Sequence, residues 1–172
     1  EALGNRSDWV DAGYPPNSQL VTLTVAVMPN NVDVAFELLT NVSTPGHPQR
    51  GRFLSRQALH ALVSHPERTA SVRSWLETSG AVIHSDGPHG HFVDVSATVA
   101  VWERMLRVDF GKFAHADNAS RTILRARGPP HVPESVATSL RGILDLAYLP
   151  PRAAFGAPER HPATPSSARE TK

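Results

Sequence analysis

The chain has 172 residues, 40% of them hydrophobic, and a formal net charge of +1 at pH 7. This balance carries no electrostatic signature of a protein that binds nucleic acid or an anionic membrane, and no apolar run reaches the roughly 20 residues of a transmembrane helix. The absence of cysteine excludes disulfides and thiolate metal sites. Length and apolar content together indicate one domain with a hydrophobic core.

The N-terminal part of the chain is predicted to hold a lead-in, a strand and a helix. Glu1 to Ser18 is a polar lead-in. Gln19 to Met28 alternates in polarity and is rich in β-branched residues, which indicates a strand. An apolar stripe at helical spacing then predicts a helix that ends near Thr40. The candidate anchors of the lead-in are Trp9 and Tyr14, and the stripe consists of Val32, Phe36 and Leu39.

Two short helices with clear end signals follow between Val42 and Ile83. Ser55 is a good N-cap for a helix over Arg56 to Ser64. Pro66 suits the first position of the next helix, because a backbone N–H would have no partner there. Gly80 can adopt the positive φ that closes this second helix. The apolar faces are Ala58, Leu59, Leu62 and Val63 in the first helix and Val72, Trp75 and Leu76 in the second.

The middle of the chain is typical of a hairpin followed by a helix. Ala81 to Ile83 begins one strand, and Phe92 to Val95 alternates in polarity as the next strand. The segment between them, His84 to Gly90, contains the aspartate, glycines and proline of a turn. Ser96 is then expected to cap a helix over Ala97 to about Arg107.

The C-terminal part is predicted to contain one strand, one helix and a tail. Asp109 to Ala116 is a loop or a short extended segment, and Arg121 to Ala126 is a strand. A last helix spans Pro133 to Gly142, and Ile143 to Leu146 is extended. From Pro150 to Lys172 the composition shifts to Pro, Ala, Ser and charged residues without any period, which indicates a linker or flexible tail.

The order of these elements predicts an α+β fold. With the additional helices treated as an insertion, the order is β-α-β-β-α-β, the ferredoxin-like split β-α-β arrangement, with Arg121 to Ala126 as its final strand. We expect an antiparallel sheet with helices on one face, and an open face of this size usually has a partner. The predicted division is a lead-in over residues 1–18, a core over 19–149 and a tail over 150–172.

Three Asn-x-Ser sequons indicate that the chain enters the secretory pathway, with chance as the alternative explanation. They begin at Asn5, Asn41 and Asn118, in predicted loops or at the ends of elements where glycosylation is feasible. The sequence starts at Glu1 without a methionine, which is compatible with the earlier removal of a signal peptide.

Motifs for catalysis or for metal binding are not found. His84, His89 and His91 lie in one predicted hairpin, and a metal could use two of them. However, no carboxylate stands at a helical i, i+4 spacing to a histidine, and H-E-x-x-H is absent. The G-x-S-x-G elbow and the phosphate-binding G-x-x-x-x-G-K-[ST] loop are absent too. We therefore expect no catalytic residue, no metal and no other cofactor in this chain, and we interpret the histidines as exposed turn residues.

A nucleic-acid-binding module is the alternative from another functional class, because RNA-recognition domains share the β-α-β-β-α-β order. The segment from Gly90 to Val93 resembles their aromatic central strand only weakly. Asp94 and Val95 stand where further aromatic or apolar partners are needed, and a carboxylate on the binding face would repel phosphate. The sequence therefore disfavours nucleic acid as a partner.

Short pieces spaced along nearly the whole foldable chain form one recognisable pattern. The pieces are Trp9, Leu20–Met28, Leu38-Leu39, Val42-Ser43, Pro45, Gly51, Phe53–Ser55, Val72, Trp75-Leu76, Gly80, Phe92-Val93, Val95, Phe110, Arg121-Thr122 and Gly128–Pro130. In order and spacing they resemble the activation prodomain of the sedolisins, the serine-carboxyl peptidases that include kumamolisin and lysosomal tripeptidyl peptidase. The resemblance covers about Trp9 to Leu146. Arg50 is a departure, since the family often has an aromatic residue before the loop glycine.

The resemblance implies a fold like that of the subtilisin propeptides and a role in controlling a peptidase. Such a prodomain helps its peptidase to fold, covers the substrate cleft and is removed in acid. The nucleophilic Ser, the paired Glu and Asp, the oxyanion Asp and the calcium loop of the peptidase domain have no matching positions here. Calcium is therefore expected only in that absent domain, and no catalytic residue is carried over.

The resemblance also implies a docking mode. The open sheet face would sit on the catalytic domain, and the tail after Leu149 would thread toward the cleft. The candidate docking residues are Thr22, Thr24, Phe92, Asp94 and Arg125. The alternative is that these residues are ordinary solvated strand positions.

The family connection gives the nine histidines a possible role in acid. Histidine titrates near pH 6.5, so a falling pH adds up to nine positive charges to a near-neutral chain, and we expect this to loosen the complex. Carboxylates of the partner are the alternative switch. A free-standing inhibitor that acts on a peptidase in trans is the second candidate function. Either function implies a lysosomal or extracellular destination.

Overall fold

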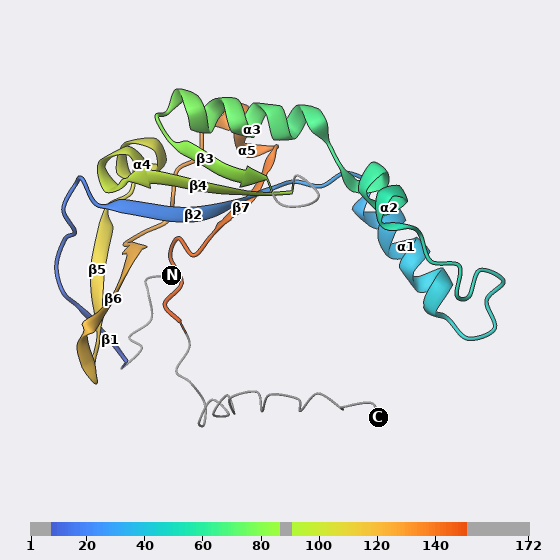
Figure 1. Ribbon diagram of the computed structural model, residues 1–172, viewed down its shortest axis with the longest axis horizontal. Coiled ribbons are helices and arrows are strands. Elements are labelled where there is room, and N and C mark those ends of the chain that lie inside the picture. The colour runs from blue at the N-terminus through green and yellow to red at the C-terminus, as the bar shows by residue number, and fades with distance from the viewer. Residues whose placement is uncertain (1–7, 87–90, 151–172) are drawn as a thin grey trace, which may run out of the picture.

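The computed structural model describes residues 8–86 and 91–150, and within them two antiparallel sheets and five helices form the fold (Figure 1). The larger sheet has the strand order β3-β4-β2-β7, and the smaller sheet has the order β1-β5-β6. The strands are β1 (Trp9–Asp11), β2 (Leu20–Val27), β3 (Val82–Asp86), β4 (Phe92–Thr98), β5 (Phe110–His115), β6 (Asn118–Ala126) and β7 (Leu140–Leu144). The helices are α1 (Val32–Ser43), α2 (Arg56–Val63), α3 (Pro66–Thr78), α4 (Val99–Leu106) and α5 (Glu134–Ala137).

The core lies between one face of the larger sheet and helices α3 and α4. Strand alternation turns Leu23 and the valines of β2 and β4 toward these helices, and the register pairs Leu23 with Val95 and Val25 with Val93. Trp102 of α4 is fully buried, and its indole N–H donates to the Val21 carbonyl at 3.0 Å. The buried core residues of these elements are Val21, Leu23, Val25, Val27, Val72, Leu76, Val93, Val95, Ala97, Val99, Trp102, Met105 and Leu106.

The fourth strand of the larger sheet is β7, so the expectation that Arg121 to Ala126 fills this place is wrong. That segment does form a strand, β6, but it pairs with β5 in the smaller sheet. The reason is local: Phe110–His115, expected as a loop or a short extended segment, is a strand that reaches β6 through a tight turn, and consecutive strands usually pair. With β7 beside β2, the order is the ferredoxin-like one, and the predicted fold class is confirmed.

Two predicted helix ends are also wrong. Ser96 lies inside β4, because β4 keeps pairing with β2 as far as Thr98. The N-cap of α4 is therefore Thr98, whose hydroxyl accepts a hydrogen bond from the Val101 backbone N–H. Gly142 lies inside β7 and does not end a helix, because α5 is only Glu134–Ala137.

Helices α1 and α2, with the loop between them, form an arm that projects from the end of the larger sheet (Figure 1). At its base, the backbone N–H of Asn30 donates to the Val63 carbonyl at 2.8 Å, and the side chain of Asn31 donates to the Leu62 carbonyl at 2.9 Å. In α1 the stripe predicted from the sequence is present, but its residues are exposed. The crossover helix that packs on the sheet is α3, and the arm is the inserted part.

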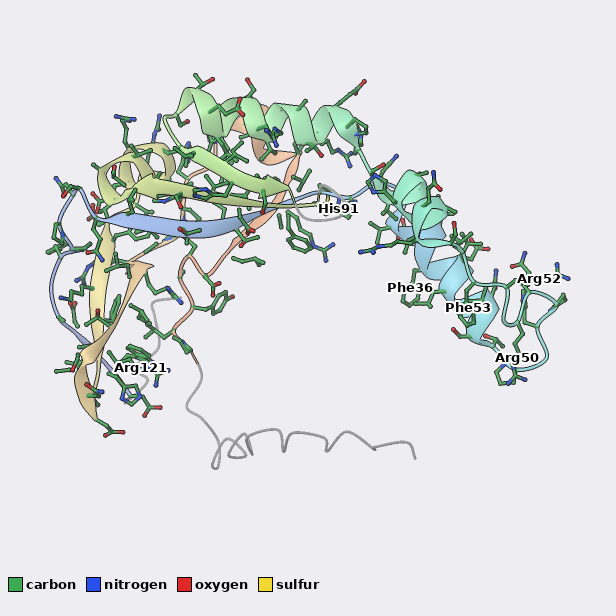
Figure 2. The ribbon with its side chains drawn as sticks, in the orientation of Figure 1. Phe36, Arg50, Arg52, Phe53, His91 and Arg121 are labelled. Atoms are coloured by element: carbon green, nitrogen blue, oxygen red, sulfur yellow. The ribbon has the colours of Figure 1, made fainter. Side chains whose placement is uncertain are left out.

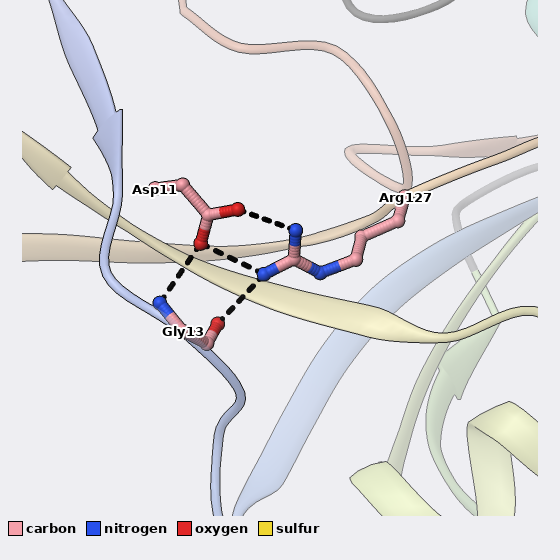
Figure 3. A network of polar contacts seen from close by, with 3 residues as sticks. All are labelled: Asp11, Gly13 and Arg127. Carbon is pink, nitrogen blue, oxygen red and sulfur yellow. Dashed lines mark hydrogen bonds and ion pairs between the residues drawn. The ribbon is translucent and has the colours of Figure 1, made fainter.

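A polar cluster fastens β1 to the smaller sheet (Figure 3). The guanidinium of Arg127 forms a bidentate ion pair with the Asp11 carboxylate and also donates to the Gly13 carbonyl at 2.9 Å. The same guanidinium stacks over the ring of Tyr14 at 4.6 Å. Part of the segment predicted as a lead-in thus forms a strand, β1, of the smaller sheet. Trp9 of this strand packs with Phe113 and Leu149 in a second small core. Of the predicted tail, residues 151–172 lie outside the described residues, as do residues 87–90 of the predicted turn.

Candidate docking face

The face of the larger sheet that lies opposite α3 and α4 has no described helix on it (Figure 1). Register places four of the five predicted docking residues on this open face. Thr24 pairs with Asp94, Thr22 pairs with Ser96, and Phe92 pairs with Ala26. Because successive strand residues alternate between faces, these residues all project away from the buried valines of the core.

The centre of the open face is a polar network that spans three strands. The carboxylate of Asp94 accepts one hydrogen bond from the Thr24 hydroxyl at 2.8 Å and another from the Ser85 hydroxyl at 2.9 Å. The hydroxyls of Thr22 and Ser96 lie 2.6 Å apart beside it. The hydrogen bond from Thr24, followed by that from Ser85, lowers the pKa of Asp94 below its ordinary value. The open face therefore keeps a negative charge at its centre into mildly acidic solution.

Exposed apolar side chains surround this polar centre. Leu20 is 70% exposed and Phe92 is 50% exposed, and Val82 and Leu144 are exposed on the two edge strands. The sequence hypothesis missed Leu20, Val82 and Leu144. The alternation of β2 could have identified Leu20, which stands two residues before Thr22. This rim places several large apolar side chains in solvent on one sheet face, which is suited to contact with a protein surface.

Arg125 does not belong to the open face. It lies on β6 in the smaller sheet, where its Nε donates to the Tyr148 carbonyl at 2.7 Å. Its guanidinium also lies 3.8 Å from the Asp145 carboxylate. Arg125 therefore holds the segment that follows β7 against the smaller sheet. Its inclusion in the predicted docking set came from the wrong assignment of β6 to the larger sheet.

The three predicted glycosylation residues lie in different settings. Asn118 is exposed at the start of β6, directly after the turn from β5, and its side-chain oxygen accepts hydrogen bonds from the N–H and the hydroxyl of Ser120. Asn41 is partly buried within α1. Asn5 lies outside the described residues. Asn118 is therefore the most accessible of the two described sequons.

No group of three or more side chains that could hold a metal ion occurs among residues 8–86 and 91–150. His84 lies on β3 and His91 directly precedes β4, while His89 lies outside the described residues. In the same ranges, none of the helices has the length and hydropathy needed to cross a bilayer.

Comparison with known proteins identifies a matching family and several related peptidases. Residues 7–149 match the family described as "Pro-kumamolisin, activation domain". The chain is 28% identical over 154 residues to "Probable tripeptidyl-peptidase SED3" of Arthroderma benhamiae, with 89% of the chain and 25% of that protein covered. It is 28% identical to "Physarolisin" of Physarum polycephalum, with 84% and 25% covered. It is 25% identical to "Tripeptidyl-peptidase 1" of Mus musculus, with 88% and 27% covered. The chain thus spans about a quarter of the length of these relatives.

Proposed function

The chain belongs to the family of pro-kumamolisin activation domains, and from this premise we propose that it is the propeptide of a sedolisin-type serine peptidase whose substrate cleft it covers until acid releases it. The catalytic domain of such a peptidase is not among the matched residues, so the chain is not itself an enzyme. In this role the chain assists the folding of the catalytic domain and inhibits it afterwards.

The observation that carries the proposal is the open face of the larger sheet. Its apolar rim is exposed on all sides of a hydrogen-bonded centre, while the helices bury the other face. An exposed apolar surface of this kind is expected to have a partner. A catalytic domain is the partner that family membership suggests, since activation domains precede one in their peptidases.

Acid release follows from the charges of the two partners. Protonation of the histidines adds positive charge to the propeptide, and protonation of carboxylates on the peptidase removes the charge that attracts it. Asp94 does not take part above its lowered pKa, because the Thr24 and Ser85 hydroxyls hold it ionised. We therefore expect the switch to lie in the histidines and in the partner, and the open face to keep its own structure in mild acid.

A propeptide of this kind belongs in the secretory pathway, with a lysosomal or extracellular destination. The exposed position of Asn118 supports glycosylation at that residue. Expression in a eukaryotic host, followed by glycosidase treatment and mass spectrometry of the Asn118 peptide, tests this part of the proposal.

The direct test mixes the 172-residue chain with the mature peptidase of the Arthroderma benhamiae relative and measures residual peptidase activity between pH 4 and pH 7. We expect inhibition near neutral pH that weakens as the pH falls. Equal inhibition at pH 7 and pH 4.5 would contradict release in acid. No inhibition at any pH would contradict the proposed function as a whole. Inhibition in trans alone does not separate a propeptide from a free-standing inhibitor. Refolding of the denatured catalytic domain with and without the chain makes that distinction, because only a propeptide is expected to speed it.

A further inference from the structure

The arm formed by α1, the loop over residues 44–55 and α2 exposes more apolar surface than its position at the edge of the fold requires. Phe36 on α1 is 69% exposed and Phe53 in the loop is 71% exposed. Within the arm, only Val42 among the residues of α1 is buried, and no residue of α2 is buried. The other exposed apolar side chains of the arm are Val32, Val34, Leu39, Leu54 and Leu59.

The arm is also positively charged over its outer part. Between Glu37 and Glu67 the sequence has no carboxylate, and it carries Arg50, Arg52 and Arg56. All three arginine side chains are exposed, and no described carboxylate forms an ion pair with them. Figure 2 shows Arg50 and Arg52 at the far end of the arm, beyond Phe36 and Phe53.

The loop of the arm is held in one shape by its own hydrogen bonds. The backbone N–H of Gly51 donates to the Val42 carbonyl at 3.0 Å, and that of Arg52 donates to the Gln49 carbonyl at 3.0 Å. The Ser55 hydroxyl caps α2 by accepting from the Ala58 N–H at 3.1 Å. The exposed aromatic and cationic side chains are thus presented on an ordered segment, which reduces the entropy lost when they bind.

The arm and the open face border the same concave side of the molecule. In Figure 1 the larger sheet forms the roof, the smaller sheet descends at one end and the arm descends at the other. Figure 2 shows Phe36 pointing from α1 toward this concave side. A partner seated on the open face would therefore also meet the apolar side of the arm.

We propose that the arm is a second docking surface of the propeptide, which binds a patch of the catalytic domain that combines apolar side chains with clustered carboxylates. This inference rests on the proposed function and adds the place and the chemistry of a second contact. Charge complementarity selects the partner, because a two-fold pairing of arms from two copies would bring like-charged arginines together. The apolar side chains supply contact area, and the arginines supply orientation and attraction at a distance.

The test measures the dissociation constant of the full chain for the mature peptidase of the Arthroderma benhamiae relative, at pH 6 and at two salt concentrations. Phe36→Ser with Phe53→Ser removes the apolar contact, and Arg50→Glu with Arg52→Glu reverses the charge. Each pair is expected to weaken binding about tenfold, and the charge-reversed pair is expected to lose the salt dependence of the dissociation constant. Arg104→Glu with Arg107→Glu is the matched control, since these exposed arginines lie on and just after α4, on the side of the sheet opposite to the open face. It is expected to change binding less than twofold.

Outcomes of this test separate the inference from the proposed function. If Thr24→Arg on the open face weakens binding while both arm pairs bind like the wild type, the inference is overturned and the proposed function stands. If the wild-type chain does not bind, both fall. Circular dichroism melting checks that the arm variants fold. As an independent measurement on the wild-type chain, binding is expected to slow amide hydrogen exchange in α1 and α2, and unchanged exchange there would also overturn the inference.

Discussion

Arg127 adds an ion pair to the strand pairing that attaches β1 to β5. The hydrogen bonds from Arg127 and from the Gly13 backbone N–H lower the pKa of Asp11 to about 2, from an ordinary value of 3.8. A carboxyl whose pKa is lower in the folded state stabilises the fold at pH values above its ordinary pKa. That contribution is lost as the pH falls toward the folded-state value. The ion pair is therefore intact at the mildly acidic pH at which the propeptide is proposed to leave its peptidase.

Asp11→Asn tests this ion pair. We expect the variant to melt at a lower temperature than the wild type at pH 7 and at pH 5, with the difference shrinking between pH 4 and pH 2, because the wild type loses its own ion pair there. Thermal melts by circular dichroism at each pH provide the measurement. Glu37→Gln, at an exposed carboxylate on α1, is the control and should melt like the wild type throughout. A difference for Asp11→Asn that is independent of pH down to pH 2 would contradict the assignment.

Gly111 makes room for the same guanidinium. A Cβ at this position would lie 2.8 Å from Arg127 Nε, 2.9 Å from Arg127 Cζ and 3.0 Å from a ring carbon of Phe113. Arg127 cannot move away without breaking its hydrogen bonds to the Asp11 carboxylate and to the Gly13 carbonyl. Gly111→Ala is therefore expected to lower the free energy of unfolding by about 1–3 kcal/mol, measured by urea denaturation. Gly142→Ala is the matched strand control, since nothing lies within 4 Å of its Cβ position; a cost at Gly142 equal to that at Gly111 would sink this explanation.

The sheet face on which a residue lies could be predicted from the sequence wherever strand alternation alone decides it. Thr22, Thr24, Phe92 and Asp94 were assigned to one face in this way, and the structure places them together. Arg125 was misplaced because its position depends on which sheet accepts β6, and alternation within a strand carries no information about its neighbour.

Among the elements, α3 shows that local sequence signals predict the two ends of a helix correctly. Its start at Pro66 and the positive φ of Gly80 after its end are confirmed, and so is the Ser55 cap of α2. Each of these signals acts within one turn of helix, so the sequence contains all that is needed. Strands β5 and β7 were assigned poorly, because β7 becomes a strand through pairing with β2, which is far away in the sequence.

The start of α4 offers a test at this scale, since the sequence favoured Ser96 and the structure has Thr98 as the cap. Thr98→Ala removes the acceptor of the Val101 N–H and is expected to cost about 1 kcal/mol of stability. Ser96→Ala removes a solvent-exposed hydroxyl contact with Thr22 and should cost no more than about 0.5 kcal/mol. Urea denaturation of the two variants measures both values. A loss of stability that is larger for Ser96→Ala than for Thr98→Ala would indicate that Ser96 is the N-cap, as expected from the sequence.

For the whole molecule, the sequence predicts the fold class and the uncovered sheet face, because both follow from the order and polarity of the elements. It could not predict that α1 and α2 leave the sheet, since an apolar helical stripe has the same pattern whether it faces the core or a partner. The exposed apolar side chains of α1 and of the open face are the two surfaces that the proposed function and the further inference assign to a partner.

The central claim is that the open sheet face sits on the catalytic domain of a sedolisin-type peptidase. The most direct measurement is the inhibition constant of Thr22→Arg against the mature peptidase of the Arthroderma benhamiae relative, beside the wild type and the Arg104→Glu, Arg107→Glu control. We predict an inhibition constant at least about tenfold higher for Thr22→Arg, because a long cation would stand between the two surfaces, and an unchanged value for the control. Undiminished inhibition by Thr22→Arg, or a loss confined to the control, would contradict the account.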